Sequence, residues 1–372
     1  ASGELGALNV AARSGITRKI DLPELKQGKE YFLRLGATLK TDEPLVKAGH
    51  EIAAEEFRLS DYAFPAFERT QTGLEVDSQN NMLIVNGKDF QMKFDKHTGL
   101  LFHLDYGNGN VLLAPLKPNF WRAPIDNDYG YNMPERLGVW KKASQHQQLL
   151  SFNALSALNG ETARGEAGAL NIEALYTLPD AGAEVKVTYH INNKGDIMVT
   201  SNLFNIAEDL PVMPRVGTNL VLHNQYRQVS WYGRGPHENY QDRFTSAFTG
   251  NYKSTVADLL YPYIRPQENG YRTGIRTVAF TNAANKGLRF SATGGDLLGF
   301  SAHHQLNSDF DEGDKKIQRH TYHIPRRNLV NVNIDYKQMG VGGDNSWGAT
   351  PHKAYQIQPD NYSYSFIISK IE

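Results

Sequence analysis

The sequence of 372 residues contains no cysteine. A disulfide framework, a thiolate nucleophile and a thiolate metal site are therefore excluded. The compartment stays open, because a chain without cysteine is equally stable in the cytoplasm and in the periplasm.

An excess of either charge is also absent. The chain has 39 basic and 40 acidic side chains, for a formal net charge of −1. No global field therefore attracts it to nucleic acid or to an anionic membrane. It has no apolar run of the length of a membrane span, and residues 1–4 do not begin a signal peptide, so we expect any targeting segment to be removed or absent.

Two common catalytic motifs are missing as well. No Gly-x-Ser-x-Gly motif supports an acyl-transfer triad. No glycine-rich loop lies between a predicted strand and a predicted helix, which argues against nucleotide binding.

What the sequence does contain is a series of short strands and hairpins. Apolar residues make up 40% of the chain and charged residues 21%, as in a folded protein with a sizeable core. The segment 50–59 fits a helix or a strand, and its neighbours favour a strand. Asn86-Gly87 predicts a type I′ turn between the strands 82–85 and 90–94. Alternating apolar residues predict further strands at 185–191, 197–204 and 362–368.

The exception is the segment from Asn132 to Gln145. Asn132 is a suitable N-cap, Pro134 suits the first turn, and Leu137, Trp140 and Ala143 share one face of a helix. One helix among a dozen or more strands predicts an all-β architecture of large packed sheets.

A glycine-rich loop follows the strand 330–336. In this strand valine, isoleucine and tyrosine alternate with asparagine and aspartate, which predicts one dry face and one wet face. Gly340, Gly342 and Gly343 then supply backbone freedom, and the loop ends at Trp347. The indole is either packed under the loop or presented to another molecule, and residue type alone favours packing.

Three further loops concentrate polar side chains. Asp126, Asn127 and Asp128 could ligate calcium, but the bidentate glutamate of an EF-hand loop is missing, and an Asp-rich turn that caps the next helix is the simpler interpretation. Glu238 and Glu268 each lie near arginines, which favours internal ion pairs over acid catalysis.

The histidines do not favour a metal site. His303 and His304 are adjacent, and His320 and His323 are expected on one strand, so each pair would point to opposite faces. We predict no metal and no cofactor bound by these residues.

Together the four loops resemble the C-terminal region of bacterial β-galactosidases of glycoside hydrolase family 2. The similarity runs from about residue 16 to the end, in the same order as in that family, and rests on the segments 119–130, 231–243, 263–272 and 339–347. The resemblance implies part of an immunoglobulin-like β-sandwich at residues 1–62, a linker at 63–73, and a C-terminal β-supersandwich similar to galactose mutarotase at 74–372. The N-terminus is expected to be a cut inside the sandwich.

The resemblance also implies a function for the parent enzyme, hydrolysis of terminal β-D-galactose residues with retention. Such enzymes need two carboxyl groups about 5 Å apart. In this family both carboxyl groups belong to glutamates of the barrel domain, and the acid/base glutamate directly follows an asparagine. No Asn-Glu dipeptide occurs in the present sequence. The chain alone is therefore expected to be inactive, with the missing N-terminal and barrel domains as partners, and Mg and Na ions, where used, in the barrel. A bacterial cytoplasm or periplasm and a homo-oligomer both remain open.

The resemblance assigns substrate contact first to Trp347. This residue matches the family's tryptophan that forms an apolar platform for the sugar. The other candidates are weaker, and for those outside the Trp347 loop we expect bracing of the fold more than substrate contact. The loop after Asp128 is similar to one that borders the pocket, although residues 129–134 share little with it beyond the glycine. The full set of weaker candidates is Asp344, Asn345, Arg122, Asp126, Asn127, Asp128, Glu268, Asn269 and Arg272.

Two other classes of function remain. A mutarotase-like fold could carry its own epimerase, with His304 or His323 paired with Glu268 to move the anomeric proton. The chain could also be a structural or carbohydrate-binding module without chemistry.

Overall fold

The computed structural model of the chain describes residues 2–6, 8, 10–70, 73–155, 170–317, 319–345 and 347–371. The chain forms unit 1, Ala1–Phe64, and unit 2, Pro65–Glu372. The regular structure described in unit 1 is one antiparallel pair, β1 (Phe32–Thr38) and β2 (Glu51–Arg58). The prediction of a strand at residues 50–59 is therefore confirmed.

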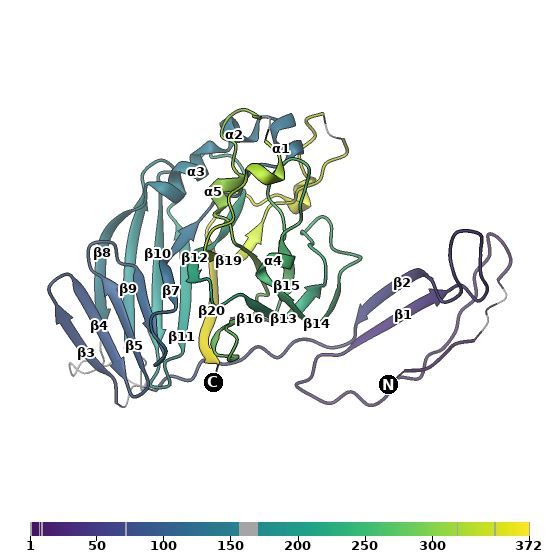
Figure 1. The fold of residues 1–372 in the computed structure, drawn as a ribbon, viewed down its shortest axis with the longest axis horizontal. Coiled ribbons are helices and arrows are strands. Elements are labelled where there is room, and N and C mark those ends of the chain that lie inside the picture. Colours follow the sequence, from purple (N-terminus) through teal and green to yellow (C-terminus); the bar gives the residue numbers. More distant parts are fainter. Residues whose placement is uncertain are drawn as a thin grey trace. The chain divides into compact units, whose positions relative to one another are not determined.

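Unit 2 is built from three antiparallel sheets (Figure 1). The nine-stranded sheet has, in spatial order, β14 (Phe248–Thr255), β13 (Gln228–Gly235), β16 (Thr277–Thr281), β17 (Gly287–Thr293), β20 (Tyr362–Ile371), β11 (Ile197–Phe204), β10 (Ala183–Ile191), β9 (Leu170–Leu178) and β8 (Gln148–Leu155). The five-stranded sheet has β15 (Arg272–Ile275), β18 (Leu298–His303), β19 (Leu329–Gln338), β12 (Arg215–His223) and β7 (Leu112–Asn119). The four-stranded sheet has β3 (Glu75–Gln79), β4 (Met82–Gly87), β5 (Phe90–Asp95) and β6 (Leu101–Asp105). The predicted all-β fold class is confirmed.

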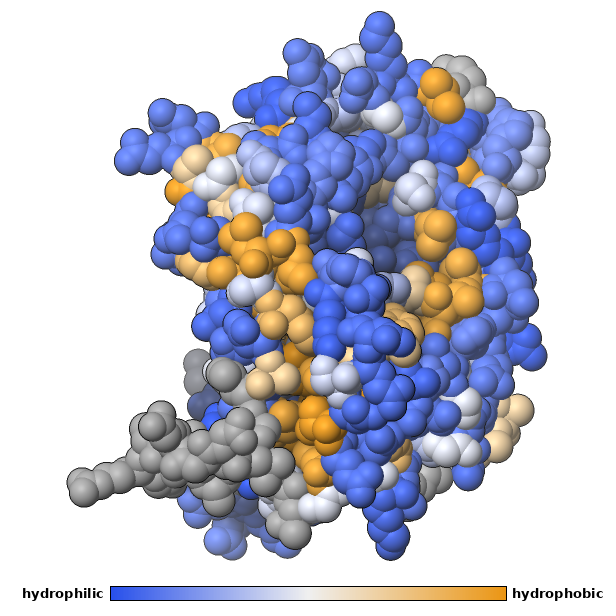
Figure 2. Space-filling model, turned by 90° about the vertical axis from the view of Figure 1, so that its left-hand side faces the viewer, coloured by the Kyte–Doolittle hydropathy of each residue, from blue (hydrophilic) through white to orange (hydrophobic). Residues whose placement is uncertain are grey.

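The cores lie where these sheets face one another. Phe300 of the five-stranded sheet packs 5.8 Å from Trp231 and 6.3 Å from Phe280 of the nine-stranded sheet, measured between ring centroids. Phe94 of the four-stranded sheet packs 5.1 Å from Tyr189 in the same way. On the side of the molecule shown in Figure 2 the surface is mainly hydrophilic, with apolar residues in several smaller groups. No helix among the described residues is long and apolar enough to cross a membrane.

Strand β19 differs from its predicted pattern. Its apolar residues face the core as expected, but Asn331, Asn333 and Asp335 are 1%, 1% and 0% exposed. The prediction of a wet face was wrong, because residues distant in sequence cover that face. We call it the polar face of the five-stranded sheet.

The segment predicted as one helix forms two short ones, α2 (Met133–Arg136) and α3 (Gly138–Gln145), and a third short helix, α1 (Asp126–Gly130), precedes it. Asn132 has a left-handed backbone, with φ of +59°, and its side chain does not cap a helix. The predicted apolar face is correct, since Leu137, Trp140 and Ala143 are buried. Further short helices are α4 (Val256–Leu259), α5 (Asn307–Phe310), η2 (Thr321–His323) and η3 (Lys353–Tyr355).

Two local predictions were wrong. Asn86 and Gly87 pair with β5 inside strand β4, so the turn follows them. A Cβ on Gly87 would lie 2.0 Å from the ring of Phe90, so this glycine gives room to an aromatic side chain instead of forming the turn. His320 and His323 do not alternate on a strand, because η2 brings their rings to a stacked arrangement with centroids 5.9 Å apart.

Candidate functional site

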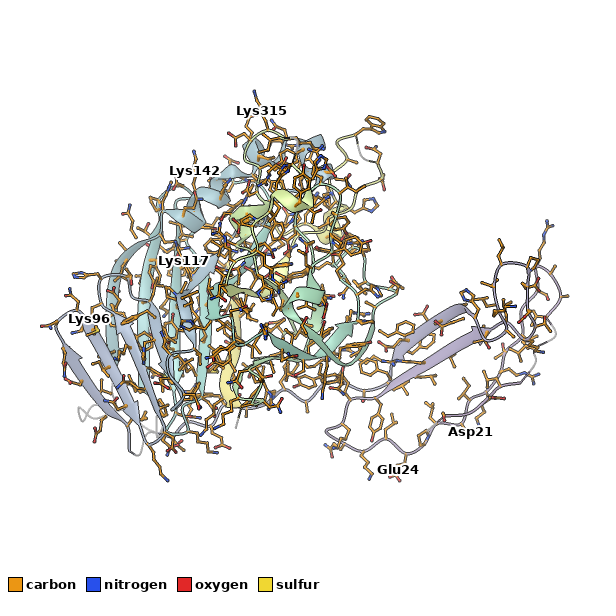
Figure 3. The ribbon with its side chains drawn as sticks, viewed as in Figure 1. Asp21, Glu24, Lys96, Lys117, Lys142 and Lys315 are labelled. Atoms are coloured by element: carbon orange, nitrogen blue, oxygen red, sulfur yellow. The ribbon has the colours of Figure 1, made fainter. Side chains whose placement is uncertain are left out.

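The four polar loops found in the sequence are joined to one another in unit 2. The amide of Gly342 donates to Asp242 Oδ2 at 2.6 Å, which ties the last loop to the second. The amide of Asp126 donates to Gln267 Oε1 at 3.1 Å, which ties the first loop to the third. Figure 3 labels Lys142, on α3, and Lys315 near the top of the view of unit 2.

The second and third loops are joined as well. Glu238 Oε2 accepts from the amide of Gly270 at 2.7 Å, and its Oε1 accepts from Arg243 at 2.7 Å and from the hydroxyl of Tyr263. Four segments spread over more than half of the sequence therefore form one braced cluster.

Trp347 projects from this cluster. Its side chain is 90% exposed, so the alternative in which it packs under its own loop is wrong for this structure. Asn345 Oδ1 accepts from the amide of Trp347 at 2.8 Å, and the exposed Asp344 pairs with Nε2 of His352 at 2.8 Å. These contacts shape the loop around the indole and leave its ring faces free of core contacts.

The base of this loop is closely packed. None of Gly340, Gly342 and Gly343 has a positive φ, so their predicted role as sources of backbone freedom was wrong. A Cβ on Gly340 would lie 2.5 Å from Asp242 Oδ2, and one on Gly343 would lie 2.6 Å from the carbonyl oxygen of Ala349. The glycines allow close approach, which fixes the position from which Trp347 projects.

Arg122 and Asp128 form a buried ion pair beside the loop. Their side chains are 0% and 1% exposed, and both guanidinium Nη atoms donate to the carboxylate. The carboxylate also accepts from the hydroxyl of Tyr131 and the amide of Ile125, each at 2.8 Å. Arg122 Nη2 reaches the carbonyl oxygen of Gly340 at 3.4 Å, which links the pair to the base of the Trp347 loop.

Asp126 and Asn127, on α1, are partly exposed. The carboxylate of Asp126 pairs with Arg265 at 3.1 Å and with Lys316 at 2.9 Å. Across the described parts of the chain, no group of three or more histidine, aspartate or glutamate side chains is arranged to hold a metal ion.

Glu268 belongs to a second buried charge cluster. Arg215 Nη2 lies 3.3 Å from Glu268 Oε1, and Arg215 Nε lies 3.2 Å from Asp335 Oδ2. The Arg215–Asp335 contact is an ion pair without hydrogen-bond geometry. Burial raises the pKa of Glu268, and burial raises the pKa of Asp335 to about 7 against the opposing effect of Arg215. The sequence does not reveal the role of Arg215, since no neighbour of this strand residue marks it as a partner of either acid.

Asn269 and Arg272 also serve internal contacts. Asn269 Oδ1 accepts from the amide of Tyr261 and contacts His303 Nε2, both at 3.1 Å. Arg272 donates to the carbonyl oxygen of Gly270 at 2.6 Å, and burial lowers its pKa to about 10. Substrate contact by either residue stays a prediction.

The predicted epimerase pairs are not assembled. Nδ1 of His304 contacts the carbonyl oxygen of Leu329 at 2.7 Å, and Nδ1 of His323 accepts from the amide of His320 at 2.9 Å. Among the described residues, neither histidine contacts Glu268, whose carboxylate pairs with Arg215.

The chain is similar to known protein families and to individual proteins. A family described as "Beta galactosidase small chain" matches residues 86–368, and one described as "Beta-galactosidase, domain 4" matches residues 1–60. The chain is 31% identical over 370 residues to a beta-galactosidase of Priestia megaterium, covering 98% of this chain and 34% of that protein. It is 31% identical to a beta-galactosidase of Halalkalibacterium halodurans, covering 93% and 33%. The chain thus spans about a third of the length of these relatives.

One solved structure with a similar fold is galactose 1-epimerase from Lactobacillus acidophilus. Its TM-score to this chain is 0.43 at 7% identity, covering 82% of this chain and 99% of that one.

Proposed function

Because this chain belongs to the beta-galactosidase family, we propose that it is the C-terminal part of an enzyme that hydrolyses terminal non-reducing β-D-galactose residues with retention. In that enzyme Trp347 completes the substrate pocket, and the remaining domains supply the catalytic carboxyl groups and any Mg or Na ions.

The observation that carries this proposal is the exposed indole on a braced loop. A tryptophan that is 90% exposed contributes little to the core of this chain. Its flat apolar face complements the C–H face of a galactose ring, whereas the hydroxyl groups of the sugar need polar partners. Those partners include the catalytic carboxyl groups, which we assign to the absent domains.

The chain's own acids support that assignment. A retaining glycosidase needs two carboxyl groups about 5 Å apart and accessible to the sugar. Here Glu238, Glu268 and Asp335 are 8%, 6% and 0% exposed, and each faces an arginine of the same chain. These acids brace the loops, so the isolated chain is expected to leave galactosides intact.

The test is the Michaelis constant of the full-length enzyme for lactose after Trp347→Ala. One sugar face covers roughly 80 Å² of indole, about half of a buried tryptophan side chain, worth about 2 kcal/mol. The expected result is a rise in KM of about 30-fold. Trp347→Phe keeps a smaller aromatic face and should show a smaller rise.

Thermal unfolding separates this role from a structural one. The exposed side chain predicts the same midpoint for Trp347→Ala as for the natural enzyme. An unchanged KM, or a large loss of stability, would overturn the proposed role of Trp347.

A further inference from the structure

A row of polar side chains crosses the middle of the five-stranded sheet. Lys117 of β7 pairs in register with Asn219 of β12, Asn219 pairs with Asn333 of β19, and Asn333 pairs with Ser301 of β18. Directly opposed residues on neighbouring strands point to the same side of a sheet. These four side chains therefore all lie on the polar face.

Asparagines around this row form what we call the amide cluster. Asn219 Nδ2 donates to Asn331 Oδ1 at 2.8 Å and to Asn333 Oδ1 at 3.0 Å. Asn331 Nδ2 donates to Asn307 Oδ1 at 2.9 Å, and Asn333 Nδ2 donates to Ser301 Oγ at 3.0 Å. The members are Asn119, Asn219, Asn307, Asn331 and Asn333. Mutual hydrogen bonds fix the orientation of these amides, so the cluster is rigid.

A cavity of about 290 Å³ opens above the amide cluster. Its walls come from β7, α3 and the segment that includes α5, and include Pro118, Trp121 and Leu306 as apolar elements. This volume is near the lower limit of ligand pockets and suits a single sugar ring. The cavity shares no lining residue with the loop from Met339 to Trp347.

Of the side-chain groups that the strands of the five-stranded sheet present to the cavity, two lack a partner within the described part of the chain. They are the oxygen Oδ1 of Asn219, an acceptor, and the ammonium group of Lys117, a donor. Lys117 is half-buried, and burial lowers its pKa. Burial disfavours the charged form of Lys117, and a negative charge beside the ammonium group would offset this, so the site favours an anion.

The other charges of the cavity neutralise each other. Lys141 Nζ pairs with Asp311 Oδ2 at 2.8 Å, and the same carboxylate accepts from Nε1 of Trp121 at 2.9 Å. Lys117 is left as the net positive charge of the cavity.

We propose that this cavity binds one sugar unit that carries a carboxylate. Lys117 binds the carboxylate, and Asn219 Oδ1 accepts from a ring hydroxyl. A simple anion such as acetate offers no hydroxyl to the amide, and a neutral hexose leaves the ammonium group without a counter-charge. The ligand class that satisfies both groups is a hexuronic acid.

The experiment is titration of this chain with D-galacturonate, D-galactose and acetate by calorimetry or ligand-observed NMR. We expect saturable binding of D-galacturonate at one site. Lys117→Gln keeps a polar side chain but removes the charge, and should weaken D-galacturonate binding about tenfold or more, to the level of D-galactose. Lys117→Arg should restore most of the affinity.

Matched controls are available in the same chain. Lys142 is exposed on α3, apart from Lys117 in Figure 3, so Lys142→Gln should bind D-galacturonate as the natural chain does. Trp347→Ala should also bind it unchanged, which keeps this site separate from the proposed role of the Trp347 loop. Circular dichroism confirms that each variant is folded.

Three outcomes would overturn the proposal. They are absence of saturable D-galacturonate binding, equal affinity for D-galactose or acetate, and unchanged affinity after Lys117→Gln. None of them bears on the KM of the full-length enzyme, so the two proposals fail independently.

Discussion

Replacing Asp128 by alanine removes the partner of a completely buried charge. Arg122 is 0% exposed, and both of its Nη atoms donate to Asp128. The same carboxylate accepts from the hydroxyl of Tyr131 and the amide of Ile125. The substitution therefore leaves an uncompensated guanidinium ion and two further donors that have lost an acceptor.

The size of the effect follows from these contacts. Breaking a buried ion pair by removing one partner costs about 3–5 kcal/mol. Each buried donor that loses its acceptor adds about 1–3 kcal/mol, less where water enters the space left by the carboxylate. We expect a loss of about 5 kcal/mol, and a fall of about 10 °C in the unfolding midpoint.

Thermal and urea unfolding of the chain measure this loss. Asp344→Ala is the matched control, because its carboxylate is 79% exposed and its partner His352 is 62% exposed, so removal should cause no measurable change. The double variant Arg122→Met with Asp128→Leu should recover much of the stability, since neither charge of this buried pair remains. Equal stability of the Asp128→Ala and Asp344→Ala variants would refute the reasoning.

Three further changes test the packing and charges of the polar face and of the loop base. Gly217→Ala should cost about 2–4 kcal/mol in unfolding free energy, because the new Cβ would lie 1.8 Å from Asp335 Oδ1, whereas Gly138→Ala, with no atom within 4 Å, should cost nothing. Since the pKa of Asp335 is raised in the folded chain to about 7, the folded state binds the extra proton and stability should fall as pH rises from about 4 to about 7, by on the order of 4 kcal/mol. Asp335→Asn should reduce that fall in urea unfolding and leave the part that comes from Glu268, whose pKa burial also raises, and an undiminished slope in the variant would exclude Asp335 as its source. Gly340→Ala would push against Asp242, and should raise the KM of the full-length enzyme while kcat changes less; an unchanged KM would show that the loop base does not position Trp347.

The sequence predicts most strands of unit 2 because their alternation reports burial directly. Strand β10 buries Val185, Val187, Tyr189 and Ile191, as its period of two indicates. The helical segment was harder. Its apolar residues are buried as predicted, but the periodic pattern does not reveal the interruption at Leu137, which ends α2 and precedes α3.

For the acidic residues at the site, the sequence predicted the type of interaction, an ion pair, but not which arginine is the partner. The preference for ion pairs at Glu238 and Glu268 rested on nearby arginines, and each acid does face an arginine. For Glu268 the partner is Arg215, which lies 53 residues away along the chain. Short-range spacing cannot reveal such a pair, because the sheet, not the local sequence, brings the two side chains together.

The polar face shows the same principle on a larger scale. The alternation along β19 correctly predicts that Asn331, Asn333 and Asp335 share a face. It does not indicate which residues cover that face. The contacts that bury it come from Asn219 and Asn307, both far from β19 in sequence. A strand with one polar face therefore has two physical outcomes, contact with solvent or an internal polar network, and the network requires every amide to find a partner. Asn219 Oδ1 and the ammonium group of Lys117 find none within the described part of the chain, and both residues line the cavity, so these two groups are open to water or to the carboxylate-bearing sugar proposed above.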